Sequence, residues 1–117
     1  RVARGAGRET GRGLRPMTWF KVANAGDIEA GHAKVVEAGG KRIALCNTGD
    51  GIYAIDDMCS HDRGPLDQGK LIGHRIECPR HGAQFDVTNG KVLSLPAVRP
   101  IRSYPTRLDG KEIEVEV

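Results

Sequence analysis

Two short stretches near the middle of the chain each place a cysteine shortly before a histidine. They are Cys59-Ser60-His61 and Cys78-Pro79-Arg80-His81, and residues 62–77 separate them. Thiolates and imidazoles are common ligands of zinc and of iron–sulfur clusters. A single Cys-x-His pair is weak support for a metal site, but two pairs bordered by glycine and proline are strong support. We therefore expect one metal centre that uses Cys59, His61, Cys78 and His81.

Two metal chemistries are compatible with these four side chains. Zinc takes four such ligands tetrahedrally, but structural zinc sites with two Cys and two His usually pair like with like, and the histidines lie on a helix. Here each stretch supplies one thiolate and one imidazole, and no helix pattern follows. A diiron cluster fits better, with both thiolates on one iron and both imidazoles on the other. A zinc-stabilised binding module is the alternative from a different class of function.

With these residues, the chain from Met17 to Val117 resembles the Rieske-type [2Fe-2S] ferredoxins, which are soluble components of ring-hydroxylating non-haem iron oxygenases. The resemblance extends to Phe85-Asp86, Thr88-Asn89-Gly90 and Leu95-Pro96-Ala97. It implies an all-β fold, in which an antiparallel β sandwich base carries a small cluster-binding subdomain at about residues 57–84.

The resemblance also implies the cofactor and its ligands. It predicts one [2Fe-2S] cluster per chain and a proline loop, Leu95-Pro96-Ala97, that covers the cluster. The exposed imidazole edges are the expected exit for the electron. The implied cluster ligands are Cys59, His61, Cys78 and His81.

In function, the resemblance implies a one-electron carrier between a flavin-dependent ferredoxin reductase and a terminal oxygenase. The chain shows no Ser/His/Asp set, phosphate-binding glycine loop or mononuclear iron triad, so we expect a carrier and not an enzyme. The small Rieske subunit of an assimilatory nitrite reductase is the alternative within the same chemistry.

The ligand types and their neighbours predict the redox potential. Two thiolates and two neutral imidazoles leave the oxidised cluster uncharged, so an electron adds more readily than to an all-cysteine cluster. High-potential members of the family have hydroxyl side chains where this chain has Ala83 and Phe85, and a disulfide where it has Gly64 and Arg80. Without these features we expect a low potential, near about −150 mV in the Rieske range.

The rest of the chain reads as short strands separated by turns. Asn89-Gly90 and Asp109-Gly110 are strong hairpin signals, and Asp27 to Ala30 suits a single helical turn. Asp56 to Ala83 is poor in strand pattern and rich in Gly, Pro, Cys and His. The expected strands are Phe20–Val22, Ala33–Val36, Arg42–Cys46, Ile52–Ile55, Ala83–Val87, Lys91–Leu95, Arg102–Leu108 and Glu112–Val117.

Composition limits the class of protein. The 117 residues suit one small domain, and no apolar run approaches the roughly 20 residues of a bilayer span. Residues 1–16 carry five Arg and one Glu, and we expect them to be a disordered tag or non-native leader, with residues 17–117 as the Rieske domain. The remainder has a formal charge of −1, so neither nucleic acid nor membrane is an expected partner. Three cysteines and no signal peptide favour a reduced, cytoplasmic monomer.

Several other residues carry weaker expectations. Cys46 lies in an apolar run and is expected to be a buried thiol, whereas His32 is expected at the surface and His74 is a weak alternative ligand. Trp19 is expected in core or edge packing. A docking face for redox partners is expected around the imidazoles, at Arg63, Gly64, Pro65, Leu66 and Arg80.

Overall fold

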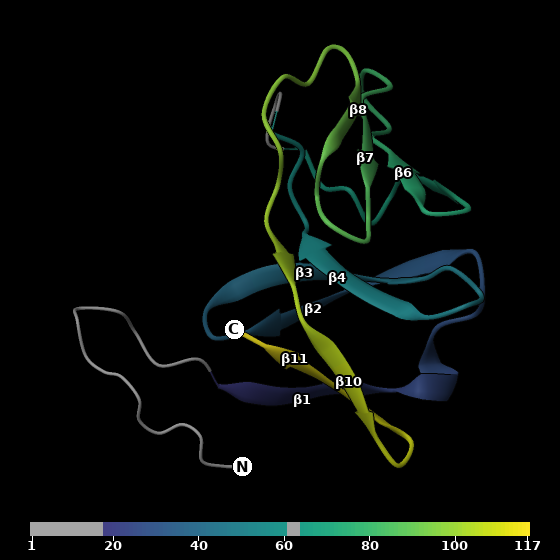
Figure 1. The fold of residues 1–117 in the computed structure, drawn as a ribbon, viewed down its shortest axis with the longest axis vertical. Coiled ribbons are helices and arrows are strands. Elements are labelled where there is room, and N and C mark those ends of the chain that lie inside the picture. Colours follow the sequence, from purple (N-terminus) through teal and green to yellow (C-terminus); the bar gives the residue numbers. More distant parts are fainter. Residues whose placement is uncertain (1–17, 61–63) are drawn as a thin grey trace.

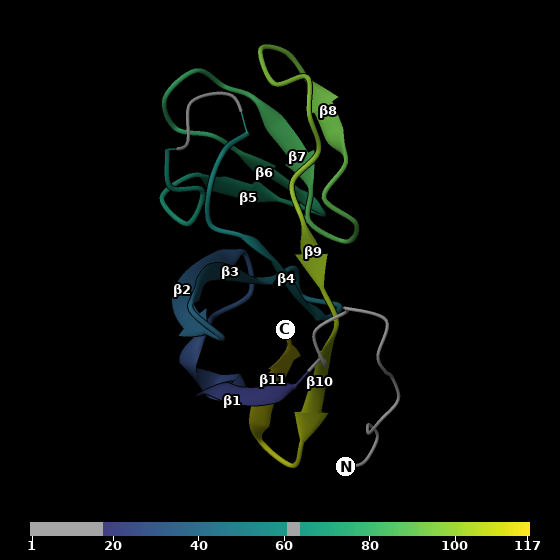
Figure 2. The same cartoon turned by 90° about the vertical axis from the view of Figure 1, so that its left-hand side faces the viewer.

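Three antiparallel sheets, stacked one above the other, make up the fold in the computed structural model, which describes residues 18–60 and 64–117 (Figures 1 and 2). The leader expected at residues 1–16 lies outside these ranges, and so does His61. The first two sheets form the base, and the third sheet forms the opposite end of the molecule.

Each sheet is assembled from neighbouring antiparallel strands. The first contains β1 (Trp19–Asn24), β11 (Glu112–Glu116) and β10 (Thr106–Asp109) in that order. The second contains β2 (His32–Ala38), β3 (Lys41–Asn47), β4 (Ile52–Asp56) and β9 (Ser103–Tyr104). The third contains β5 (Lys70–Ile72), β6 (Arg75–Glu77), β7 (Gln84–Asp86) and β8 (Val92–Ser94). A 3₁₀ turn, η2 (Ala25–Asp27), links β1 to β2, so the helical turn expected at Asp27 to Ala30 lies earlier in the chain.

Strand β3 of the second sheet is buried on both faces, and its sequence explains how. Four consecutive residues of this strand, 43–46, are 0% exposed. Because successive side chains point to opposite faces of a sheet, Ile43 and Leu45 pack into the core of the base, while Ala44 and Cys46 pack toward the third sheet. The base core also contains Ala23, Ile28, Ala38, Ala54, Tyr104, Ile113 and Val115. A continuous apolar run is what a strand between two cores requires.

The all-β class is confirmed, and the expected strands are found with two corrections, one in the third sheet and one in the base. The segment from Asp56 to Ala83 was expected to be poor in strands, but it contains the β5–β6 hairpin, which turns at Gly73 with φ +58°. Each of these strands has three residues, which is too short to produce an alternating pattern. In addition, Pro105 divides the strand expected at 102–108 into β9 and β10.

The chain crosses between the base and the third sheet at two adjacent places. It leaves after β4 and returns through residues 101–103 into β9, which pairs with β4 (Figure 2). Asp56 fastens the returning segment, because its backbone N–H donates to the Arg102 carbonyl at 2.9 Å. The Tyr104 hydroxyl donates to Asp56 Oδ1 at 2.6 Å. The described part of the chain contains no helix with the length and hydropathy of a membrane span.

Candidate metal centre

Two hydrogen-bonded turns position the cysteines of the expected metal site. Cys59 follows β4, and its backbone N–H donates to the Gly64 carbonyl at 2.8 Å. Cys78 follows β6, and its N–H donates to the Ala83 carbonyl at 2.7 Å, while the Gly82 N–H donates back to the Cys78 carbonyl at 3.0 Å. Gly82 has φ +80°, a left-handed conformation that glycine adopts readily. Cys78 therefore begins a tight turn directly after β6, and a backbone hydrogen bond holds Cys59 beside Gly64.

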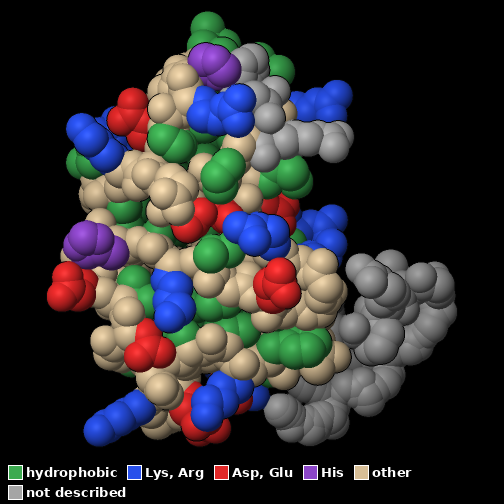
Figure 3. Space-filling model, turned by 180° about the vertical axis from the view of Figure 1, so that it is seen from behind, with side chains coloured by type: hydrophobic (Ala, Val, Ile, Leu, Met, Phe, Trp, Pro, Cys, Tyr) green, Lys and Arg blue, Asp and Glu red, His purple; other side chains and the backbone are tan. Residues whose placement is uncertain are grey.

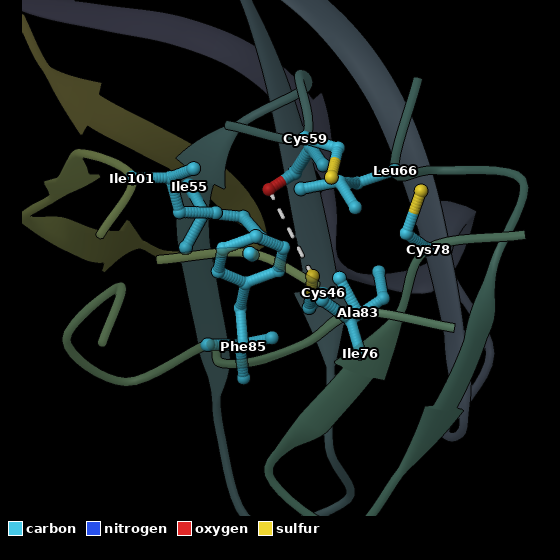
Figure 4. Packing of buried hydrophobic residues seen from close by; sticks show 12 residues of the cluster. Cys46, Ile55, Cys59, Leu66, Ile76, Cys78, Ala83, Phe85 and Ile101 are labelled. Atoms are coloured by element: carbon cyan, nitrogen blue, oxygen red, sulfur yellow. Dashed lines mark hydrogen bonds between the residues drawn. The ribbon is translucent and has the colours of Figure 1, made fainter. Parts of the chain in front are cut away.

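The two cysteine side chains lie in one apolar cluster. Cys59 is 0% exposed and Cys78 is 1% exposed, and both belong to the cluster that contains Leu66 and Ala83 (Figure 4). All three cysteines lie in the described ranges, and none is in a disulfide. A buried thiolate is costly unless a cation compensates its charge. Two reduced cysteines at neighbouring turns in a dry environment are a donor set that fits a soft metal centre.

The structure describes only one of the two expected histidine ligands. His81 is exposed and lies in the same turn as Cys78, three residues after it. His61 lies outside the described residues. Within residues 18–60 and 64–117, no three His, Cys, Asp or Glu side chains are grouped as ligands of a single ion. A diiron cluster divides its ligands two and two, so it does not require such a group. The full ligand set therefore stays a prediction.

The third cysteine, Cys46, has a different environment. It lies in β3, and its thiol contacts the Ala44 carbonyl at 3.9 Å, a weak hydrogen bond. Burial, together with the nearby Asp57 carboxylate, raises the pKa of Cys46 to about 12. The side chain thus stays protonated at neutral pH and packs as a small hydrophobic residue. The expectation of a buried thiol is confirmed.

The remaining histidines and the tryptophan have partners in the base. His74 Nε2 lies 3.0 Å from Asp50 Oδ2, and its ring meets Tyr53 edge to face with centroids 5.7 Å apart. His32 is exposed, as expected, with Nε2 3.7 Å from a Glu29 carboxylate oxygen. Trp19 packs at the edge of the first sheet, beneath the Arg107 guanidinium at 4.1 Å.

The proline loop lies beside the first cysteine turn. The Ser60 hydroxyl donates to the Arg99 carbonyl at 2.6 Å, which joins the residue after Cys59 to the end of this loop. The Leu95–Pro96 bond is cis. Leu95 is 75% exposed and Val98 is 77% exposed, so the loop presents two large apolar side chains to solvent. The sequence pattern did not indicate this contact, because Ser60 and Arg99 are far apart in the chain.

Asp57 is the functional candidate that sequence reasoning missed. It is the buried charged residue of the described ranges, at 5% exposure, and it lies two positions before Cys59. Burial raises the pKa of the Asp57 carboxyl; the hydrogen bond from the Asp67 backbone N–H opposes this shift, and the Asp67 carboxylate adds to it. No local pattern marks this residue, because its partners are Arg42 in another strand and the backbone N–H groups of Leu66 and Asp67 later in the same loop.

Known proteins resemble the chain in both sequence and fold. A family model described as the Rieske [2Fe-2S] domain matches residues 18–105. The ferredoxin component of the naphthalene 1,2-dioxygenase/salicylate 5-hydroxylase systems from Ralstonia sp is 35% identical over 101 residues, covering 86% of this chain and 97% of that protein.

Two solved structures have the same architecture. The ferredoxin of carbazole 1,9a-dioxygenase from Nocardioides aromaticivorans IC177 matches with a TM-score of 0.81 and 36% identity, covering 84% of this chain and 96% of that chain. A chain from the complex of reduced oxygenase and oxidised ferredoxin in carbazole 1,9a-dioxygenase matches with a TM-score of 0.79 and 35% identity, covering 83% and 91%. The expected β sandwich base with a smaller cluster-binding part is confirmed.

Proposed function

This chain belongs to the Rieske [2Fe-2S] domain family, and from that premise we propose that it carries single electrons from a reductase to a terminal non-haem iron oxygenase. Its similarity to ferredoxin components over nearly their whole length is the observation that carries the proposal. The chain is an electron-transfer component, and in this proposal substrate turnover belongs to the oxygenase.

The family gives the chain one [2Fe-2S] cluster, which supplies reversible one-electron chemistry when bound. We propose that the Cys59 and Cys78 thiolates hold one iron and that His61 and His81 hold the other. The two buried cysteine side chains and the exposed His81 support this division. The thiolates are then shielded from water, while an imidazole edge reaches the surface where a partner can approach.

The surroundings of the cysteines support a low potential. Ala83 and Phe85 are fully buried in the same cluster as Cys59 and Cys78, and neither side chain has a hydroxyl to donate to a sulfur. The nearby Ser60 hydroxyl donates to the Arg99 carbonyl instead. Fewer hydrogen bonds to the cluster sulfurs leave the reduced state less stabilised.

We expect a redox titration followed by visible absorption to give one reversible one-electron transition near about −150 mV. The matched variant is Phe85→Tyr, which adds only a hydroxyl, and its midpoint is expected to be higher than that of the parent protein. A parent midpoint well above zero would contradict the low-potential assignment.

The end of the molecule that carries the site differs in charge from the base. Residues 57–60 and 64–102 contain six Lys and Arg and four Asp and Glu, a formal charge of +2. The described part of the base contains six Lys and Arg and nine Asp and Glu, a formal charge of −3. Figure 3 shows a histidine, hydrophobic side chains and Lys or Arg side chains together at the end formed by the third sheet.

Gly64 and Leu66, which were expected in a docking face, are buried, and Arg63 lies outside the described residues. We propose instead a docking face made of exposed residues at this end: Arg80, His81, Leu95, Val98 and Arg99. Its partners would present an apolar patch bordered by acidic side chains. The charge asymmetry turns the positive end of the carrier toward such a partner, which speeds encounter at low salt. A small contact with mixed chemistry suits a shuttle that must release each partner quickly.

Replacing Arg80 with Glu tests this face. We expect the rate of reduction by a flavin-dependent ferredoxin reductase, measured by stopped flow at low salt, to fall about tenfold because a favourable charge becomes repulsive. The absorption spectrum should stay unchanged. Lys111→Glu makes the same charge change in the exposed β10–β11 turn of the base and should leave the rate unaltered. Equal rates for both variants and the parent protein would exclude Arg80 from docking.

We further propose that the reductase is flavin-dependent. We also propose that the protein is a monomer and that it acts in the cytoplasm. A carrier that meets two partners in turn through one face needs that face uncovered, which favours a monomer.

A further inference from the structure

A buried carboxylate lies at the junction between the base and the first cysteine turn. Asp57 directly follows β4, and its side chain is 0% exposed. A buried charge is costly unless it is paired and hydrogen-bonded. The contacts of Asp57 therefore indicate what this residue does in the fold.

Asp57 binds two parts of the chain at once. Its Oδ1 accepts hydrogen bonds from the backbone N–H groups of Leu66, at 2.9 Å, and Asp67, at 2.7 Å. Its Oδ2 accepts from Arg42 Nη2 at 3.1 Å, and its own backbone N–H donates to the Arg42 carbonyl at 3.1 Å. Asp57 thus fastens the far end of the Cys59 loop to strand β3 of the base.

Two sets of hydrogen bonds, one inside the other, join the two ends of the loop that contains Cys59. The hydrogen bond from the Cys59 N–H to the Gly64 carbonyl forms the inner layer, and Asp57 with Leu66 and Asp67 forms the outer layer. The Leu66 side chain is 0% exposed and packs in the cluster that contains both Cys59 and Cys78. Holding the Leu66 backbone therefore also holds an apolar contact of the expected ligands.

The Leu66 backbone is also linked to the second cysteine loop. The Gly69 N–H donates to the Leu66 carbonyl at 2.9 Å, so the turn after Leu66 is also closed. A Cβ on Gly69 would lie 1.8 Å from the Glu77 carbonyl oxygen, which shows how closely this backbone approaches β6. Glu77 immediately precedes Cys78. A continuous path of backbone contacts thus connects Asp57 to both cysteine loops.

We propose that Asp57 is a positioning residue that fixes the separation of the two cysteine loops, and so the spacing of the two sulfur ligands. The inference rests on the proposed ligand set of the cluster. Without the carboxylate, the N–H groups of Leu66 and Asp67 lose their acceptor and the loop loses its attachment to β3. The loops then separate more easily, and the cluster is held less firmly.

The experiment compares Asp57→Ala and Asp57→Asn in the full chain as isolated with its cluster. The readouts are the rate of iron release to an excess of chelator and the electron paramagnetic resonance spectrum of the reduced protein. We expect iron release from Asp57→Ala to be about tenfold faster and its g values to shift, since buried N–H groups are left without partners. Asp57→Asn should be intermediate, because its amide oxygen can still accept from both N–H groups.

Asp67→Asn is the matched control. It keeps the backbone N–H that Asp57 binds and removes the neighbouring carboxylate, whose negative charge raises the pKa of Asp57, so Asp57 keeps both of its N–H partners. We expect iron release and g values like those of the parent protein. Equal effects from Asp67→Asn and Asp57→Ala would show that charge alone matters, and an unaltered Asp57→Ala would equally overturn the inference.

Two further measurements separate this inference from misfolding and from the proposed ligand set. Fluorescence of Trp19, which lies in β1 of the first sheet whereas Asp57 follows β4 of the second, reports whether the base is folded. If Asp57→Ala does not fold, Asp57→Asn decides between the outcomes. Cys59→Ser tests the ligand set itself, because retention of a normal cluster by that variant contradicts the proposed ligands whatever the Asp57 variants do.

Discussion

Replacing Cys78 with Ser is expected to leave the protein without its cluster. The hydroxyl of serine is a far weaker donor to iron than the thiolate that the proposal places there, and the second thiolate cannot hold the iron alone. The purified variant should lose its visible absorption and contain little iron or acid-labile sulfide, whereas the parent protein should contain two of each per chain.

Cys46→Ala provides the matched control for this result. Cys46 is as buried as Cys78 and lies in the same apolar cluster, but it comes from strand β3 and not from a cysteine turn. We expect this variant to keep its iron and sulfide, with a loss of stability of about 1 kcal/mol from the small cavity. A Cys78→Ser protein with full cluster content would contradict the ligand assignment. Colourless parent protein with one zinc per chain would favour the zinc-stabilised module.

Gly90→Ala is expected to destabilise the fold strongly. Gly90 lies in the β7–β8 turn with φ +80°, and a Cβ there would lie 2.0 Å from the Ile101 carbonyl oxygen. The Ile101 N–H donates to the Gly90 carbonyl at 2.9 Å, so the turn and the returning segment are in direct backbone contact. Separating them breaks this contact, and we expect the free energy of unfolding to fall by about 3 kcal/mol or more.

Gly110→Ala isolates the steric part of this effect. Gly110 has a similar φ of +66° in the β10–β11 turn, but nothing lies within 4 Å of an added Cβ. We expect only the cost of a left-handed alanine, about 1–2 kcal/mol. Urea denaturation followed by circular dichroism and by Trp19 fluorescence measures both variants. Similar losses for the two would show that the Gly90 backbone does not approach Ile101 as closely as described.

The parts of the fold that follow from local pattern were predicted from the sequence. The hairpins at Asn89-Gly90 and Asp109-Gly110 are examples, because the turn residues themselves select the geometry. The apolar run 43–46 predicted a strand, but only the structure shows that its alternate residues enter two different cores. The β5–β6 hairpin was missed because three-residue strands carry no periodic signal.

In the candidate site, too, some residues were predictable from the sequence and others were not. Paired Cys and His residues at short spacing identify potential ligands directly, because thiolates and imidazoles bind metals whatever their surroundings in the fold. The residues that hold those loops in place are not recognisable in this way. Asp57 and Gly69 act through contacts with Arg42, Leu66 and Glu77, and such contacts exist only after the second and third sheets have come together.

The pairing of β4 with β9 has a consequence for how such a carrier can be modified. Ile55 lies opposite Ser103 in the neighbouring strands β4 and β9. The stretch between these two residues therefore leaves the base and returns to it at the same edge of the second sheet. Its length and sequence can therefore vary while the rest of the sandwich keeps its register, much as a loop tolerates insertion. This stretch cannot be removed altogether, because it covers Ala44, Cys46 and Ile55. Without it, these side chains would form an apolar surface exposed to solvent.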